Sequence, residues 1–129
     1  MIYGIGTDIV EVERIEASLD QFGDSFAKRI LASSEWADYE ASKLKARFLA
    51  KRFAAKEAFA KAIGTGIRGD VSFQNIAVTH DALGRPLLQL SSTLQAFLKQ
   101  HHIYQSHISI SDEKNLALAY VVLETTQAA

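Results

Sequence analysis

Two long stretches of the chain have apolar residues three or four positions apart, a pattern that predicts helices. They cover residues 11–22, before Gly23, and residues 43–63, before Gly64. The second stretch is rich in Ala, Lys, Leu and Glu and contains no Gly or Pro, and glycine suits the position that follows a helix. Shorter helices are predicted over residues 26–31, around Trp36 and Tyr39 with Ser33 or Ser34 as the cap, and over residues 92–100.

Short apolar runs bounded by turn residues predict strands. Residues 2–9 form the first, and Gly4 and Gly6 within it allow a bulge or the close approach of another backbone. Separate helices and antiparallel hairpins predict an α+β fold, a small antiparallel sheet packed on the long helix, in a single domain over residues 1–129. Two hairpins are predicted, 76–79 with 87–90 and 107–111 with 117–123.

The composition narrows the class of protein. A chain of 129 residues with 48% apolar and 22% charged residues is typical of one globular domain and argues against disorder. The lack of cysteine excludes disulfides, thiolate metal sites and a cysteine nucleophile, and it favours a cytoplasmic location. The N-terminus lacks the pattern of a signal peptide, and no apolar run approaches the roughly 18 residues of a membrane helix.

The net charge of -1 conceals a basic segment. Residues 43–61 contain seven of the 14 basic residues and one acidic residue, Glu57, so this segment carries +6. Such segregation suits a surface for phosphates or an acidic partner, although a solvated helix face is the commoner explanation.

Two carboxylates are candidate metal ligands. Asp8 follows the first strand and precedes a helix, so it either caps that helix or points into a cleft from the strand end. Glu57 lies four residues before Lys61, a spacing that also forms ordinary surface ion pairs worth about 0.3–0.5 kcal/mol. Since Mg²⁺ needs few protein ligands beside water and substrate phosphates, the two carboxylates are a candidate magnesium site.

The loop after the long helix, residues 64–69, matches G-x-G-x-x-G. It follows a helix and precedes a strand, the reverse of the dinucleotide-binding arrangement, and it lacks the Gly-Lys-Ser/Thr of a P-loop. Beside Lys61 and Arg68, the loop is still a candidate for phosphate contacts. Three histidines without metal-ligand spacing are expected on the surface: His80, His101 and His102.

Residues 4–14, GIGTDIVEVER, resemble the first signature of bacterial holo-[acyl-carrier-protein] synthases, and residues 52–62, RFAAKEAFAKA, resemble the second. The family's order continues through residues 64–66, 84–86 and 107–111, so the resemblance covers essentially the whole chain. It implies a Mg²⁺-dependent 4′-phosphopantetheinyl transferase. Such an enzyme moves the phosphopantetheine arm of coenzyme A onto a serine of apo-acyl carrier protein and releases adenosine 3′,5′-bisphosphate.

The resemblance assigns roles to individual residues. Asp8 and Glu57 match the Mg²⁺ ligands, and Lys61 is placed to offset charge on the departing phosphate. The base that accepts the serine proton is left open, with a metal-bound water held by Glu57 or Asp8 as the candidate. The residues implied around coenzyme A are Arg52, Lys61, Gly64, Thr65, Gly66, Arg85, Pro86 and His107.

The resemblance also implies a docking surface for the carrier protein. Arg14 matches a docking position, and Lys28 and Arg29 are expected to extend its basic patch, which would speed the encounter with an acidic partner. The chain departs from many relatives at Asp112, where they carry a second histidine. No catalytic role of that histidine is therefore carried over.

The family implies a homotrimer with active sites between subunits. Residues 117–123 are apolar at nearly every position, and such a strand needs cover on both faces. The long helix can cover one face, so whichever of Val121 and Val122 points outward is expected to meet a neighbouring subunit. Asp8 and Glu57 of one chain are then expected to face coenzyme A contacts of another.

Two other classes of function stay open on the sequence. A non-catalytic module would bind an acidic protein through residues 43–61 and would tolerate neutral replacements of Asp8 and Glu57. A nucleic-acid-binding domain would show a salt-sensitive affinity for DNA or RNA. Against the latter, the sequence has no helix-turn-helix or RNP signature and is slightly acidic overall.

Overall fold

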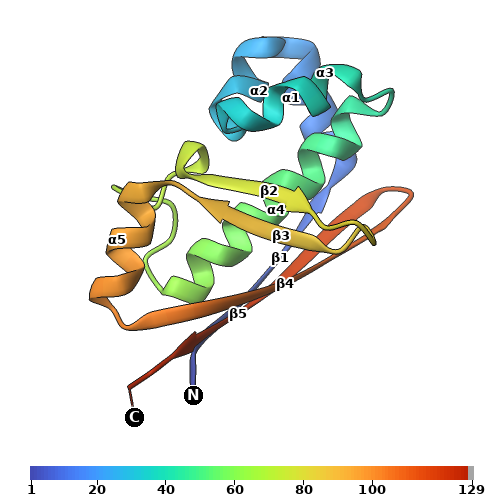
Figure 1. The fold of residues 1–129 in the computed structure, drawn as a ribbon. Coiled ribbons are helices and arrows are strands. Elements are labelled where there is room, and N and C mark those ends of the chain that lie inside the picture. The colour runs from blue at the N-terminus through green and yellow to red at the C-terminus, as the bar shows by residue number, and fades with distance from the viewer. Residues whose placement is uncertain (128–129) are drawn as a thin grey trace.

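A computed structural model describes residues 1–127 of the chain (Figure 1). Separate helices and antiparallel strands confirm the predicted α+β class. Within the described residues, no helix has the length and apolar character needed to cross a membrane. In chain order the elements are β1 (Ile2–Glu11), α1 (Val12–Phe22), α2 (Asp24–Ile30), a 3₁₀ helix (Ser33–Glu35), α3 (Trp36–Ala41), α4 (Lys45–Ile63), a second 3₁₀ helix (Phe73–Asn75), β2 (Ile76–His80), β3 (Pro86–Leu90), α5 (Ser92–Gln100), β4 (Ile103–Glu113) and β5 (Leu116–Thr125).

The strands form a three-stranded antiparallel sheet and a separate hairpin. In the sheet, β5 lies between β1 and β4, so the two ends of the chain pair with each other. Strands β2 and β3 form the second, two-stranded sheet. Both predicted hairpins are confirmed, although β4 starts at Ile103 because its pairing with β5 continues well before His107.

Helix α4 is the centre of the molecule. The β1 and β5 strands pack along one side of it, and on its other side Arg52 and Lys56 reach β2 and the end of α2. Figure 1 shows α1, α2 and α3 gathered at one end of α4, and the β2–β3 hairpin passing over its middle. Many small alanines, buried on several sides of α4, permit this close cover.

Close contact between α4 and β1 depends on two glycines. A Cβ atom on Gly4 would lie 2.0 Å from the carbonyl oxygen of Ala62, and one on Gly6 would lie 2.0 Å from that of Ala58. Only glycine can occupy positions so close to another backbone. The close approach predicted from these glycines is confirmed.

The two faces of the three-stranded sheet differ in cover. Alternate β5 residues, including Val121 and Leu123, are fully buried against α4. The other face carries exposed apolar side chains, among them Ile5 and Ile9 of β1 and Tyr120 of β5. Val122 is half-buried and points to this outer face, so it is the outward residue of the pair predicted from the sequence.

Two local predictions were wrong. No serine side chain caps the third helix. Instead, the Glu35 carboxylate accepts a hydrogen bond of 2.9 Å from the Ala32 backbone N–H. Asp8 is not at a strand end and does not cap α1, because pairing with β5 continues β1 as far as Glu11.

Candidate active site

Asp8, Glu57 and Lys61 meet in one cleft. Gly4, Gly6 and Asp8 alternate onto the face of β1 that packs on α4, so the crossing at Gly6 brings Asp8 beside the helix. One turn separates Glu57 from Lys61 on that helix. The cleft measures about 450 Å³ and is lined by Asp8, Ile9, Val10, Arg14, Ile15, Ser18, Phe26, Phe53, Glu57 and Lys61.

The Lys61 ammonium is bound directly to β1. Its Nζ lies 3.0 Å from the Asp8 Oδ1 atom and 3.0 Å from the Thr7 carbonyl oxygen. The Lys61 side chain is 51% exposed, whereas that of Asp8 is 15% exposed. Lys61 therefore pairs with Asp8, and the ordinary helix-surface ion pair with Glu57, which the spacing left open, is not formed.

Glu57 is the less satisfied of the two carboxylates. Burial, and next the charge of Asp8, raise the pKa of Glu57, while Lys61 acts in the opposite direction. Two neighbouring carboxylates of this kind suit a divalent cation. Mg²⁺ keeps much of its water and needs few protein ligands, so the donor set of this pair is compatible with it. Within residues 1–127, no group of three or more His, Cys, Asp or Glu side chains is placed for a metal.

An apolar wall faces these charged groups. Phe26 of α2 and Phe53 of α4 line the same cleft as Asp8, and the Phe53 ring stacks on Phe73 with centroids 5.6 Å apart. Arg14 of α1 also lines this cleft. Sequence reasoning missed the two phenylalanines, because an aromatic residue in an amphipathic pattern is normally assigned to the core.

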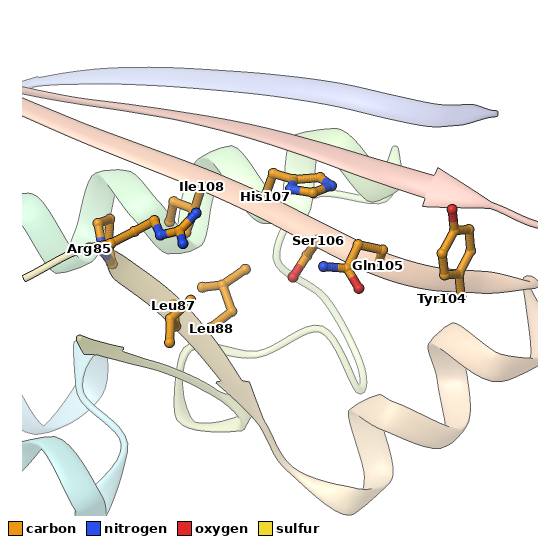
Figure 2. A pocket seen from close by; sticks show the side chains of 9 residues that line it. Arg85, Leu87, Leu88, Tyr104, Gln105, Ser106, His107 and Ile108 are labelled. Carbon is orange, nitrogen blue, oxygen red and sulfur yellow. The ribbon is translucent and has the colours of Figure 1, made fainter. Parts of the chain in front are cut away.

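Arg85, Pro86 and His107 line a second cavity of about 510 Å³ between β3 and β4. Figure 2 shows Ser106 pointing from β4 into this space while His107 lies on the opposite side of the strand. The His107 Nε2 atom lies 2.7 Å from the Glu124 Oε2 atom, and this contact is the main cause that lowers the pKa of Glu124. The structure thus places Arg85 and Pro86 at a cavity other than the one that holds Asp8 and Glu57, whereas the His107 side chain lies on the other side of β4, against Glu124.

The glycine loop follows Lys61 by one turn. Gly64 ends α4 with φ of 98° and Gly66 has φ of 70°, conformations that favour glycine. Both backbone N–H groups donate to the Ala60 carbonyl oxygen, at 3.1 and 3.2 Å, so the loop closes the helix end as predicted. Thr65 donates its hydroxyl to the Gly66 carbonyl oxygen at 2.8 Å.

Arg52 faces the interior of this chain. Its guanidinium lies 2.8 Å from Glu35 and also donates to the Val78 carbonyl oxygen, and the residue is 6% exposed. Lys56, on the same side of α4, completes a buried cluster with Glu35. Arg52 was expected at coenzyme A, whereas Glu35 and Lys56 were not singled out from the sequence. The spacing of Arg52 and Lys56, four residues apart on one helix, is the signal that was available.

The predicted docking residues do not share one cavity. Arg14 lines the Asp8 cleft, whereas Lys28 lies with its Nζ 5.4 Å from the centre of the Trp36 ring and lines another cavity. The Arg29 carbonyl oxygen accepts a hydrogen bond of 2.8 Å from Gln74, and its side chain is exposed.

Asp112, which was singled out in the sequence as a departure from the family pattern, pairs with the basic helix. Its Oδ2 atom lies 2.9 Å from Arg47, and its Oδ1 atom lies 3.9 Å from Lys51. Arg47 also donates to the carbonyl oxygens of Glu113 and Lys114. Asp112 therefore helps to hold the β4–β5 turn against α4.

Comparison with known proteins agrees with this geometry. The chain is 54% identical to the holo-[acyl-carrier-protein] synthase of Nitrosospira multiformis over 124 residues, which cover 96% of this chain and 99% of that one. The fold superposes on the crystal structure of the holo-[acyl-carrier-protein] synthase from Neisseria meningitidis with a TM-score of 0.95 and 50% identity, covering 97% of this chain and 100% of that one. For a holo-(acyl-carrier-protein) synthase from Bacillus anthracis in complex with CoA (3′,5′-ADP), the TM-score is 0.82 and the identity 43%, with 98% and 99% of the two chains covered.

The family profile of the 4′-phosphopantetheinyl transferase superfamily matches residues 4–121. This match covers α4, β4 and most of β1 and β5, and so includes both carboxylates of the cleft and His107 of β4. The chain belongs to the 4′-phosphopantetheinyl transferase superfamily.

Proposed function

We propose that this protein is a holo-[acyl-carrier-protein] synthase. It transfers the 4′-phosphopantetheine group of coenzyme A to a serine of apo-acyl carrier protein, giving holo-acyl carrier protein and adenosine 3′,5′-bisphosphate. The observation that carries the proposal is the convergence of Asp8, Glu57 and Lys61 on one cleft in a chain of this superfamily.

The reaction is a phosphoryl transfer. A base accepts the proton of the serine hydroxyl, and the serine oxygen forms a bond to the phosphorus that carries the pantetheine arm. The bond from that phosphorus to the bridging oxygen of the pyrophosphate breaks, and adenosine 3′,5′-bisphosphate leaves. Asp8 and Glu57 would hold Mg²⁺, which supplies charge neutralisation at the phosphates. Lys61 neutralises charge on the departing phosphate, since its half-exposed ammonium can reach a group in the open part of the cleft.

Coenzyme A binding is assigned to two groups of residues. One group, Lys61 with Gly64, Thr65 and Gly66, lies beside the carboxylates or at the end of the same helix. The other lines the cavity between β3 and β4 and comprises Arg85, Pro86 and His107. For Arg52, a contact with coenzyme A stays a prediction, and in this chain its guanidinium is already bound by Glu35.

We assign a homotrimer to the protein, with the two groups of coenzyme A residues contributed by adjacent chains. Support comes from the outer face of the three-stranded sheet, where Ile5 and Ile9 are 58% and 59% exposed and Tyr120 is 42% exposed. A contiguous apolar face of this kind favours association. Carrier-protein docking is assigned to Arg14, with Lys28 and Arg29 as outlying basic residues. The single domain and the cytoplasmic location stay predictions.

The decisive experiment is to incubate the protein with coenzyme A, Mg²⁺ and apo-acyl carrier protein and to weigh the carrier protein by mass spectrometry. Wild type should add the mass of phosphopantetheine. Asp8→Ala and Glu57→Ala should each nearly abolish the addition, whereas Glu113→Ala, an exposed acid at the end of β4, should leave it intact. Full activity of both cleft variants would contradict the metal assignment. Binding of an acidic protein without any mass change would favour the non-catalytic module.

A further inference from the structure

The position of the Lys61 ammonium bears on how a metal enters the cleft. Its Nζ is held by two oxygens of β1, the Asp8 carboxylate and the Thr7 carbonyl, each at 3.0 Å. Asp8 is one of the two carboxylates assigned to Mg²⁺. A positive charge from the protein itself therefore already neutralises this carboxylate.

The second carboxylate has no such partner. Within residues 1–127 none of the ion pairs involves Glu57. Glu57 and Asp8 nevertheless line the same cleft as Lys61, which follows Glu57 by one turn of α4. Lys61 is thus the cation of a cleft with two carboxylates, which is the place that a divalent cation would take.

We propose that Lys61 is an internal counter-ion that competes with the metal for Asp8 and yields its place when substrate phosphates arrive. The inference rests on the proposed function, because it takes Asp8 and Glu57 as the metal ligands. Its consequence is that a divalent cation binds weakly to the free protein and more tightly in the presence of coenzyme A.

The mobility of the two partners determines which one moves. Asp8 lies on a paired strand and its side chain is 15% exposed, whereas the Lys61 side chain is 51% exposed at the end of a flexible four-carbon stem. An ion pair with one partner half-exposed to water is weak enough to exchange. A phosphate that binds Lys61 frees Asp8 for the metal, so each ligand increases the affinity for the other by the same factor.

The experiment measures Mn²⁺ binding by electron paramagnetic resonance, with and without coenzyme A, in wild type and Lys61→Met. Without coenzyme A, Lys61→Met should bind Mn²⁺ about fivefold more tightly than wild type, as expected from loss of one partly exposed ion pair. Coenzyme A should tighten Mn²⁺ binding to wild type clearly more than to the variant. A merely structural role of Lys61 would not tighten metal binding.

Three controls make the result specific. Lys45→Met removes the same charge near the other end of α4, where Lys45 binds the carbonyl oxygens of Glu40 and Ser42, and it should leave Mn²⁺ affinity unchanged. Lys61→Arg keeps the positive charge and should bind Mn²⁺ with the affinity of the wild type. Asp8→Asn should abolish binding.

Equal or weaker Mn²⁺ binding by Lys61→Met, with wild type binding the ion, would overturn the counter-ion role alone. An equal increase of Mn²⁺ affinity in Lys45→Met would also overturn the counter-ion role, because the increase would then come only from the lower net positive charge. Failure of wild type to bind Mn²⁺ with or without coenzyme A would overturn the metal assignment of the proposed function, and the counter-ion role with it.

Discussion

The Lys56 ammonium lies 2.5 Å from the Glu35 carboxylate, and the two side chains are 0% and 2% exposed. Lys56 also donates to the carbonyl oxygens of Ile30 and Phe73. Burial lowers the pKa of Lys56 to about 8, with Glu35 opposing this shift, so the lysine is still mainly charged at neutral pH. This contact ties the end of α2 and the segment before β2 to the helix that carries Glu57.

We expect Lys56→Met to destabilise the fold by about 3–5 kcal/mol, because it leaves a buried carboxylate without its ammonium partner. The free energy of unfolding in urea would measure this. Lys51→Met, on the exposed side of the same helix, should cost less than about 1 kcal/mol. A double variant with Glu35→Gln should lose less than the two single losses added together, and additive losses would contradict a direct pair.

Gly6→Ala should destabilise the protein by about 3 kcal/mol or more, since the new Cβ would have to displace the Ala58 backbone, 2.0 Å away. Thermal unfolding is the measurement, and Thr93→Ala, on the exposed side of α5, is the control. Normal stability of Gly6→Ala would show that α4 and β1 can move apart.

Glu57→Gln should unfold at a higher temperature than wild type at pH 7 in the presence of a metal chelator. The pKa of Glu57 is raised in the folded protein, so folding favours its protonated form. The free energy of unfolding therefore falls as the pH rises from 4.5, the ordinary pKa of a glutamate, through the raised pKa of the folded protein. Glutamine removes this penalty. The gap between the two melting temperatures should therefore widen as the pH rises from 4.5 and become constant above the raised pKa. A gap that does not change with pH anywhere above 4.5 would contradict a raised pKa of Glu57.

Arg14→Glu should raise KM for apo-acyl carrier protein on the order of tenfold and leave KM for coenzyme A nearly unchanged, because it reverses a charge that faces an acidic partner. Steady-state assays at increasing salt are the measurement. Added salt should raise KM for the carrier protein more in wild type than in the variant, so the difference between the two KM values should become smaller. An equal rise of KM for coenzyme A would instead place Arg14 at the nucleotide.

Val122→Lys should yield monomers with little activity, since a lysine on the outer face of β5 would be buried without a partner between subunits. Sedimentation at micromolar concentration and the transfer assay check this together. Thr93→Lys, on the exposed side of α5, should stay a trimer. A wild type that is monomeric and fully active would refute the assembly and leave the metal assignment untouched.

Local physical chemistry was enough to predict most elements of the fold. The long helix is predicted by its alanines and lysines and by Gly64 after it, and the hairpins by their apolar runs and turns. The observed bounds differ mainly at the ends: α4 starts at Lys45 and β4 at Ile103, because pairing and packing partners decide where an element stops. The prediction of a serine cap for the third helix was wrong. Arg52 and Lys56, which are distant in sequence, hold the Glu35 carboxylate where it accepts a hydrogen bond from the Ala32 backbone N–H.

The sequence by itself determined the candidate chemistry: two carboxylates, a lysine and a glycine loop, in an order specific enough to indicate the superfamily. Only the tertiary structure decided which groups meet. Lys61 pairs with Asp8, 53 residues away, instead of with Glu57 one turn before it. The reason is that helical spacing governs contacts along one element, whereas the crossing of α4 over Gly4 and Gly6 governs contacts between elements. That crossing angle is set by packing of the whole core, which no local pattern encodes.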